Sequence, residues 1–231
     1  MTSAPDRVFT PGVIRRLAQL AGIILLQAVA LFGSAGTLAW SAAWVYMAVY
    51  VGGIVASGVI MLPRHTALIE ARGRIAPEHG WDAVFMAVYS VAGIGLLVVA
   101  GLDERFGWTA PLPVVARIAG GLLVLLGYAL FVWAMYSNAY FQAVSRAQPE
   151  RGQTVARGGP YRWVRHPGYA GLVAYSLACP CLLGSAWAFI PALAQKFAVN
   201  PVEIHVSHNQ RELGTSKYGL FQLIRLNFDL M

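Results

Sequence analysis

The residues best suited to chemistry lie between Gly158 and Gly171, where the chain reads Gly-Gly-Pro-Tyr-Arg-Trp-Val-Arg-His-Pro-Gly-Tyr-Ala-Gly. We call residues 158–171 the polar segment. Two arginines, Arg162 and Arg165, are suited to paired hydrogen bonds with a carboxylate or phosphate. The aromatic rings of Tyr161, Trp163 and Tyr169 are suited to stacking on a heterocycle or facing a cation. The segment therefore predicts a ligand site.

A simpler interpretation is a membrane-boundary anchor, because arginine and aromatic side chains gather where a span meets the headgroups. Taken singly, each arginine and tryptophan fits that role, and His166 alone fits a satisfied polar residue. The segment also contains two prolines and four glycines within its fourteen residues. This density of polar, aromatic and helix-breaking residues favours a site over an anchor.

Local backbone chemistry points in the same direction. Gly158-Gly159-Pro160 predicts a turn, and Pro167 disfavours helical backbone at His166. Non-helical backbone at membrane depth needs protein cover or a wet cavity, because its polar groups find no partners in lipid. A ligand pocket meets both needs.

Composition indicates that an integral membrane protein positions this segment. The 231 residues are 58% hydrophobic and 12% charged, with a mean hydropathy of +0.58, whereas an ordinary soluble domain has about 25% charged residues. Charge-free runs cover 17–63, 83–102, 118–145 and 167–195. The first run is long enough for two spans, which we place near 15–33 and 40–62 with a break at Gly33–Thr37. Trp40 and Trp44 then lie where an aromatic belt is expected.

The ends of this pattern leave alternatives open. A cleaved signal peptide is the competing interpretation of the first span, but the stretch is long enough to cross and further spans follow. The last run, 167–195, is either one strongly tilted helix or a hairpin that turns at Gly184-Ser185, with a second arm from near Trp187. We favour the hairpin. The expected fold is an all-α membrane protein with five to six transmembrane helices.

Arginine positions predict the orientation. One side of the expected spans collects eleven arginines and the other only Arg105 and Arg117 before the last run; the eleven are Arg7, Arg15, Arg16, Arg64, Arg72, Arg74, Arg146, Arg151, Arg157, Arg162 and Arg165. By the positive-inside rule the amino terminus and the polar segment face the cytoplasm. The net charge of +7 then forms a basic rim suited to anionic headgroups or ligands, and nucleic acid need not be invoked.

The carboxy-terminal part differs in composition from the rest. Both lysines, Lys196 and Lys217, and three of the four asparagines fall within 196–231. We therefore expect one transmembrane domain over 1–195, with a cofactor loop at about 146–170, and an atypical tail over 196–231. Cys179 and Cys181 flank Pro180 in an apolar run without other ligand types, which favours small core residues over a metal site.

The polar segment carries a family resemblance. The string Gly-Pro-Tyr-x-x-Val-Arg-His-Pro-x-Tyr, preceded by Arg151-Gly-Gln-Thr-Val155 and by Trp133-Ala-Met-Tyr-Ser-Asn138, resembles the isoprenylcysteine carboxyl methyltransferase and phospholipid methyltransferase families of membrane enzymes. The likeness covers roughly residues 115–195. It implies S-adenosylmethionine as methyl donor, bound on the cytoplasmic side.

Position by position, the resemblance implies cofactor contacts at nine residues: Gln153, Thr154, Val155, Ala156, Tyr161, His166, Pro167, Gly168 and Tyr169. Arg162 and Arg165 are the candidates for substrate binding. The family also places a glutamate and an arginine after the hairpin. Glu203, Arg211 and Glu212 are the charges available there, but their surroundings do not match the motif, so neither role is assigned.

The function expected from these observations is methylation of a lipid-embedded acceptor, by analogy a prenylcysteine-type carboxylate or a phospholipid amine. The expected partners are the membrane and a lipid or lipidated substrate, while the oligomeric state stays open. Two alternatives remain: a sterol-type membrane reductase using NADPH, and a non-catalytic accessory protein that retains the fold. The atypical tail is the main support for the last.

Overall fold

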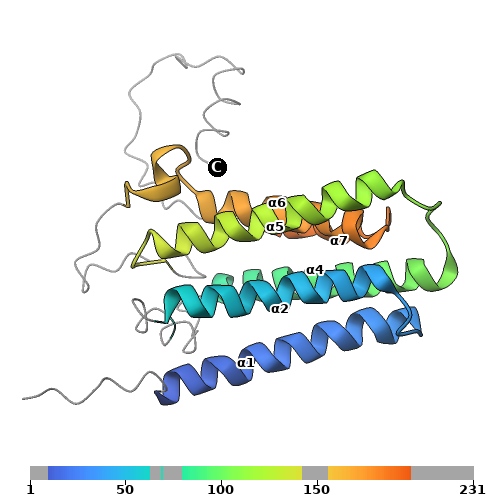
Figure 1. Ribbon diagram of the computed structural model, residues 1–231. Coiled ribbons are helices and arrows are strands. Elements are labelled where there is room, and N and C mark those ends of the chain that lie inside the picture. Colours follow the sequence, from blue (N-terminus) through green and yellow to red (C-terminus); the bar gives the residue numbers. More distant parts are fainter. Residues whose placement is uncertain (1–9, 63–68, 70–79, 142–155, 199–231) are drawn as a thin grey trace, which may run out of the picture. The chain divides into compact units, whose positions relative to one another are not determined.

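The computed structural model describes residues 10–62, 69, 80–141 and 156–198, all within the first of two units, Met1–Asn200. Within these ranges every regular element is helical (Figure 1). The elements are α1 (Pro11–Ala28), η1 (Val29–Gly33), α2 (Ser41–Met61), α4 (Gly80–Phe106), α5 (Val114–Tyr136), η3 (Gly159–Arg162), α6 (Pro167–Leu183) and α7 (Phe189–Ala198). The expected tail lies outside the described residues from 199 onward, so its boundary stays a prediction.

The membrane prediction is confirmed. Four helices are long and apolar enough to cross a bilayer: Pro11–Gly33, Ser41–Met61, Met86–Phe106 and Val114–Tyr136. The shorter α6 is also apolar. Large aliphatic side chains such as Leu25, Val59 and Leu126 are more than 60% exposed, as expected where lipid replaces water. The cytoplasmic placement of the amino terminus stays a prediction.

The first apolar run forms two helices, as predicted, but the break lies later than expected. Backbone through Gly33 continues as the π-helix η1, and the chain turns at Gly36, whose φ of 67° is in the left-handed region. Ser34 Oγ donates to the carbonyl of Ala30 at 2.5 Å, a bond within the helix that serine readily makes. The small residues at 33–35 are therefore compatible with helix, and Gly36 supplies the turn.

The last apolar run is a hairpin. Gly184 ends α6 with a φ of 80°, and its N–H donates to the carbonyl of Pro180 at 2.9 Å. This is a glycine cap in the left-handed conformation. The second arm, α7, begins at Phe189, close to the start expected near Trp187.

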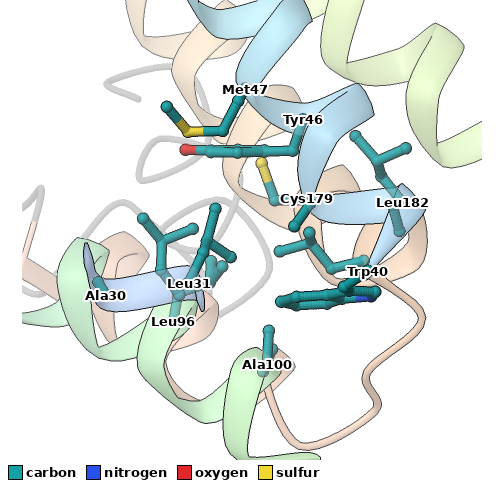
Figure 2. Packing of buried hydrophobic residues seen from close by; sticks show 14 of the residues in the cluster. Ala30, Leu31, Trp40, Tyr46, Met47, Leu96, Ala100, Cys179 and Leu182 are labelled. Atoms are coloured by element: carbon teal, nitrogen blue, oxygen red, sulfur yellow. The ribbon is translucent and has the colours of Figure 1, made fainter. Parts of the chain in front are cut away.

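A single buried cluster holds α2, η1, α4, α6 and α7 together. Figure 2 shows Leu31, Trp40, Leu96, Ala100 and Cys179 among its side chains. The prediction of an aromatic belt is wrong for Trp40, which is only 3% exposed because it packs into this cluster. Trp44, by contrast, is 54% exposed. Cys179 is buried, as expected for a small core residue.

Helices α5 and α6 pack most closely, and this contact positions the polar segment between them. A Cβ on Gly127 would lie 2.7 Å from the carbonyl oxygen of Gly171, and one on Gly171 would lie 2.6 Å from that of Gly127. The two backbones are therefore in direct contact, a geometry that only small residues permit. The carboxyl end of α5 and the amino end of α6 are thereby held together.

At the opposite end of the helices, the buried carboxylate of Asp103 connects two interhelical links. Asp103 Oδ1 accepts from Thr109 N at 2.7 Å, and Asp103 Oδ2 accepts from Thr109 Oγ1 and Ser185 Oγ, each at 2.5 Å. The Thr109 hydroxyl in turn accepts from Ala186 N at 3.0 Å. These bonds connect the α4–α5 link to the α6–α7 turn.

We expect Asp103→Asn to lower the free energy of unfolding by about 1–2 kcal/mol, because a neutral amide replaces charge-assisted bonds and presents a single acceptor atom. Denaturant titration in detergent micelles measures the change. Glu104→Gln is the matched control, since Glu104 is exposed. Equal stabilities for the two variants would contradict the role assigned to Asp103.

Candidate functional site

The polar segment starts against the carboxyl end of α5. Gly159 has a φ of 57°, and a Cβ there would collide with Ser137 Oγ and lie 3.1 Å from Trp133 Nε1. Glycine is thus required both for conformation and for space. Pro160 is buried at the first turn of η3. The predicted turn at 158–160 is confirmed, and it seats the segment on α5.

Tyr161 lies where this turn meets the end of α5. Asn138 Nδ2 is 3.4 Å from Tyr161 Oη, and Asn138 Oδ1 accepts from Tyr140 N at 2.9 Å, so the amide is oriented by the chain that follows α5. Burial raises the pKa of Tyr161, and the bond from Asn138 partly opposes the rise. The hydroxyl is therefore neutral at physiological pH and can donate a hydrogen bond.

His166 marks the junction between the polar segment and α6. Its backbone, with φ −127° and ψ 63°, is not helical, as the following proline predicts. Pro167 and Gly168 are buried behind it, and a Cβ on Gly168 would lie 2.7 Å from the ring of Phe141. The His166 and Tyr169 rings have centroids 5.8 Å apart, and both side chains are exposed. The exposed histidine side chain thus projects next to a buried, closely packed backbone.

The arginines of the segment lie on its outer side. Arg162 and Arg165 are both exposed, and the Arg162 guanidinium lies 4.9 Å from the centre of the Trp163 ring. Trp163 in turn meets Trp133 edge to face, with centroids 5.7 Å apart. This stack of Arg162, Trp163 and Trp133 has the character of a boundary anchor, whereas Tyr161, His166 and Tyr169 do not belong to it.

The structure brings most of the predicted cofactor residues into one short stretch. Ala156 and Tyr161 are half-buried, Pro167 and Gly168 form the base, and His166 and Tyr169 are exposed. Gln153, Thr154 and Val155 lie outside the described residues. Sequence reasoning did not assign Ser137 and Asn138, which seat the segment. Their position directly after a predicted span could have indicated this role, because hydroxyl and amide side chains at helix ends commonly bond to neighbouring backbone.

The arrangement suits a mixed polar and aromatic ligand. It combines the neutral Tyr161 hydroxyl with the rings of His166 and Tyr169, beside the exposed guanidinium groups of Arg162 and Arg165. Such a set can bind a heterocycle together with an anionic or cationic group. Among the described residues, no three His, Cys, Asp or Glu side chains converge on a possible metal site.

Comparison with known proteins identifies one family. Residues 120–204 match the model of the isoprenylcysteine carboxyl methyltransferase (ICMT) family. The match includes most of α5, the whole polar segment, α6 and α7. The resemblance to the isoprenylcysteine carboxyl methyltransferase family, drawn from roughly the same residues, is confirmed.

Curated relatives match only a short piece. Undecaprenyl-phosphate 4-deoxy-4-formamido-L-arabinose transferase from Edwardsiella ictaluri (strain 93-146) is 56% identical over 43 residues, 19% of this chain and 13% of that protein. The enzyme of that name from Pectobacterium carotovorum subsp. carotovorum (strain PC1) is 54% identical over the same share. The chain thus covers about an eighth of these relatives. No solved structure matches.

Proposed function

From the premise that residues 120–204 belong to the isoprenylcysteine carboxyl methyltransferase family, we propose that this protein transfers a methyl group from S-adenosylmethionine to a lipid-embedded acceptor. The observation that carries the proposal is the polar segment itself. It is an aromatic and basic stretch that leaves helical conformation between η3 and α6, at residues 163–166, and that Gly159, Pro160 and Pro167 hold against the ends of α5 and α6. Non-helical backbone at membrane depth needs protein cover or a wet cavity, and a ligand pocket meets that need.

The residues present fit the donor's chemistry. Tyr161 offers a neutral, half-buried hydroxyl, and the exposed rings of His166 and Tyr169 offer faces for an adenine or a sulfonium. Arg162 and Arg165 stay the candidates for substrate binding, since their guanidinium groups suit a carboxylate or phosphate of the acceptor. Gln153, Thr154, Val155 and Ala156 complete the proposed donor set on the approach to the segment. We place the site on the cytoplasmic side, following the arginine bias.

The proposed chemistry asks little of the protein beyond positioning. When bound, S-adenosylmethionine would supply a sulfonium methyl group, whose carbon is attacked in line by an acceptor oxygen or nitrogen while the C–S bond breaks and neutral S-adenosylhomocysteine leaves. The segment binds and orients the reactants and excludes water, a contribution that reaches effective molarities of about 10⁵ M or more in favourable cases. A carboxylate acceptor needs no general base. An amine acceptor must lose a proton, and the His166 imidazole is the group placed to accept it.

The test is transfer of labelled methyl to membrane lipids by the full chain. We expect Tyr161→Ala and His166→Ala each to reduce transfer at least tenfold while the protein stays inserted, because each removes a side chain from the proposed donor site. Arg105→Ala is the control, since Arg105 lies at the far end of α4, beside Gly36 and Phe106. Equal rates for all three variants and the unmodified protein would exclude the polar segment as the site.

A further inference from the structure

An apolar groove runs between α2 and α5. Its volume is about 720 Å³, within the range typical of small-molecule sites. The lining extends from Ala48 to Ile60 on α2 and from Leu125 to Tyr136 on α5, and none of the lining residues is charged. The one aliphatic hydroxyl among them, Ser57 Oγ, donates to the carbonyl of Ile54 at 2.9 Å, so it is already satisfied. The groove therefore suits a hydrocarbon.

The groove has the length of one lipid leaflet. Its lining residues on each helix extend over about 17 Å, since a helix rises 1.5 Å per residue. The hydrocarbon core of a bilayer is about 30 Å thick, so one leaflet provides about 15 Å. A single lipid chain therefore matches the groove end to end.

One end of the groove adjoins the polar segment. Trp133 lines the groove, and the same side chain packs against Trp163 and lies under Gly159. Tyr136 lines the same end, next to the buried pair Met61 and Met135. A lipid whose chain occupied the groove would thus bring its head to the segment proposed to bind the methyl donor.

Glycines on α2 provide the room for a chain. A Cβ on Gly53 would lie 2.7 Å from the Tyr128 ring, so that ring forms the wall at this level. Gly52 faces open space, with nothing within 4 Å of a Cβ built there. Gly52 lies about 12 Å along α2 from Ile60, at two thirds of the groove's length. A larger side chain at Gly52 would therefore shorten the space, and its Cβ would meet no protein atom.

We propose that the α2–α5 groove holds the hydrocarbon chain of the methyl acceptor and that Gly52 and the Gly53–Tyr128 contact set the chain length it accepts. The proposal rests on the proposed methyl transfer and adds that selection depends on a single chain of about one leaflet's length. Its head remains at the polar segment, where the acceptor oxygen or nitrogen meets the donor methyl.

The experiment compares Gly52→Leu with Gly58→Leu in the full chain. Gly58 lies on the same helix, also with nothing within 4 Å of a built Cβ, but does not line the groove. Transfer is measured on carboxylates and amines carrying one alkyl chain of stepwise increasing length. We expect Gly52→Leu to favour shorter chains, with about fourfold loss for each methylene that no longer fits. Gly58→Leu should keep the unmodified chain-length preference. An unchanged preference in Gly52→Leu would overturn the proposal.

A binding readout separates the groove from the reaction. A single-chain fatty acid with a photoactivatable group at its chain end is incorporated with the protein into phosphatidylcholine nanodiscs, and the labelled peptides are mapped. We expect labelling concentrated on the groove faces of α2 and α5 and reduced at least tenfold by Gly52→Leu. Even labelling of all exposed apolar faces, or crosslinking of this face to a second copy of the chain, would overturn the proposal. If S-adenosylhomocysteine still binds in either case, the proposed function stands and only the groove assignment fails.

Discussion

Replacing Gly127 with alanine is expected to lower the free energy of unfolding by about 3 kcal/mol. The added methyl group would meet Gly171 O and Tyr175 N, both at 2.7 Å, and both are backbone atoms that cannot rotate away. Relief requires α5 and α6 to separate, which disrupts the closest helix contact in the described residues. Unfolding in mixed micelles with increasing dodecyl sulfate measures the loss.

Gly121→Ala provides a control of opposite expected sign. Gly121 lies on the same helix, and its added methyl would meet only the end of the Leu182 side chain, at 3.4 Å. Alanine also stabilises a helix by up to about 1 kcal/mol relative to glycine. We therefore expect unchanged or increased stability. If both alanine variants lose stability equally, direct backbone contact at Gly127 is not what holds α5 to α6.

Gly159→Ala is expected to weaken binding of S-adenosylhomocysteine at least tenfold. A left-handed backbone costs an alanine about 1–2 kcal/mol, and 1.4 kcal/mol corresponds to tenfold in affinity. The new Cβ would also collide with Ser137 Oγ. The turn must therefore move away from α5, which separates Tyr161 from Asn138. Equilibrium dialysis with labelled S-adenosylhomocysteine measures the change.

Gly158→Ala is the control that distinguishes a specific effect at Gly159 from a general effect of adding a methyl group to this loop. Gly158 has a φ of −91° and nothing within 4 Å of a built Cβ, so Gly158→Ala should bind the donor product as the unmodified protein does. Thermal unfolding of Gly158→Ala should match that of the unmodified protein, whereas Gly159→Ala should unfold a few degrees lower, as about 1–2 kcal/mol of local cost implies, and remain folded at the temperature of the binding measurement. Normal binding by Gly159→Ala would show that the seat on α5 does not shape the donor site.

Membrane class and hairpin could be predicted because they depend on composition and on single residues. Charge-free runs of span length leave few alternatives to apolar helices. Gly184-Ser185 in the last run predicted the turn that the structure shows. The non-helical backbone at His166 followed from Pro167 alone. Each of these features depends on residues close together in the chain, so a single sequence is enough to predict it.

Features that depend on partners distant in sequence could not be predicted. The face of α5 that contacts α6 uses Gly120 and Gly127, spaced seven apart. Such spacing is common in spans and does not identify its partner. Trp40 likewise fitted a belt until the cluster that covers it was known. The groove arises only where α2 and α5 lie together.

The central claim is that the polar segment binds S-adenosylmethionine, and calorimetric titration of the full chain in nanodiscs tests it most directly. The account predicts one-to-one binding of S-adenosylhomocysteine, at least tenfold weaker binding in Tyr161→Ala, and no binding of NADPH. Binding of NADPH instead would support the reductase alternative. An inserted, folded protein that binds S-adenosylhomocysteine equally well with and without Tyr161, or does not bind it at all, would contradict the account.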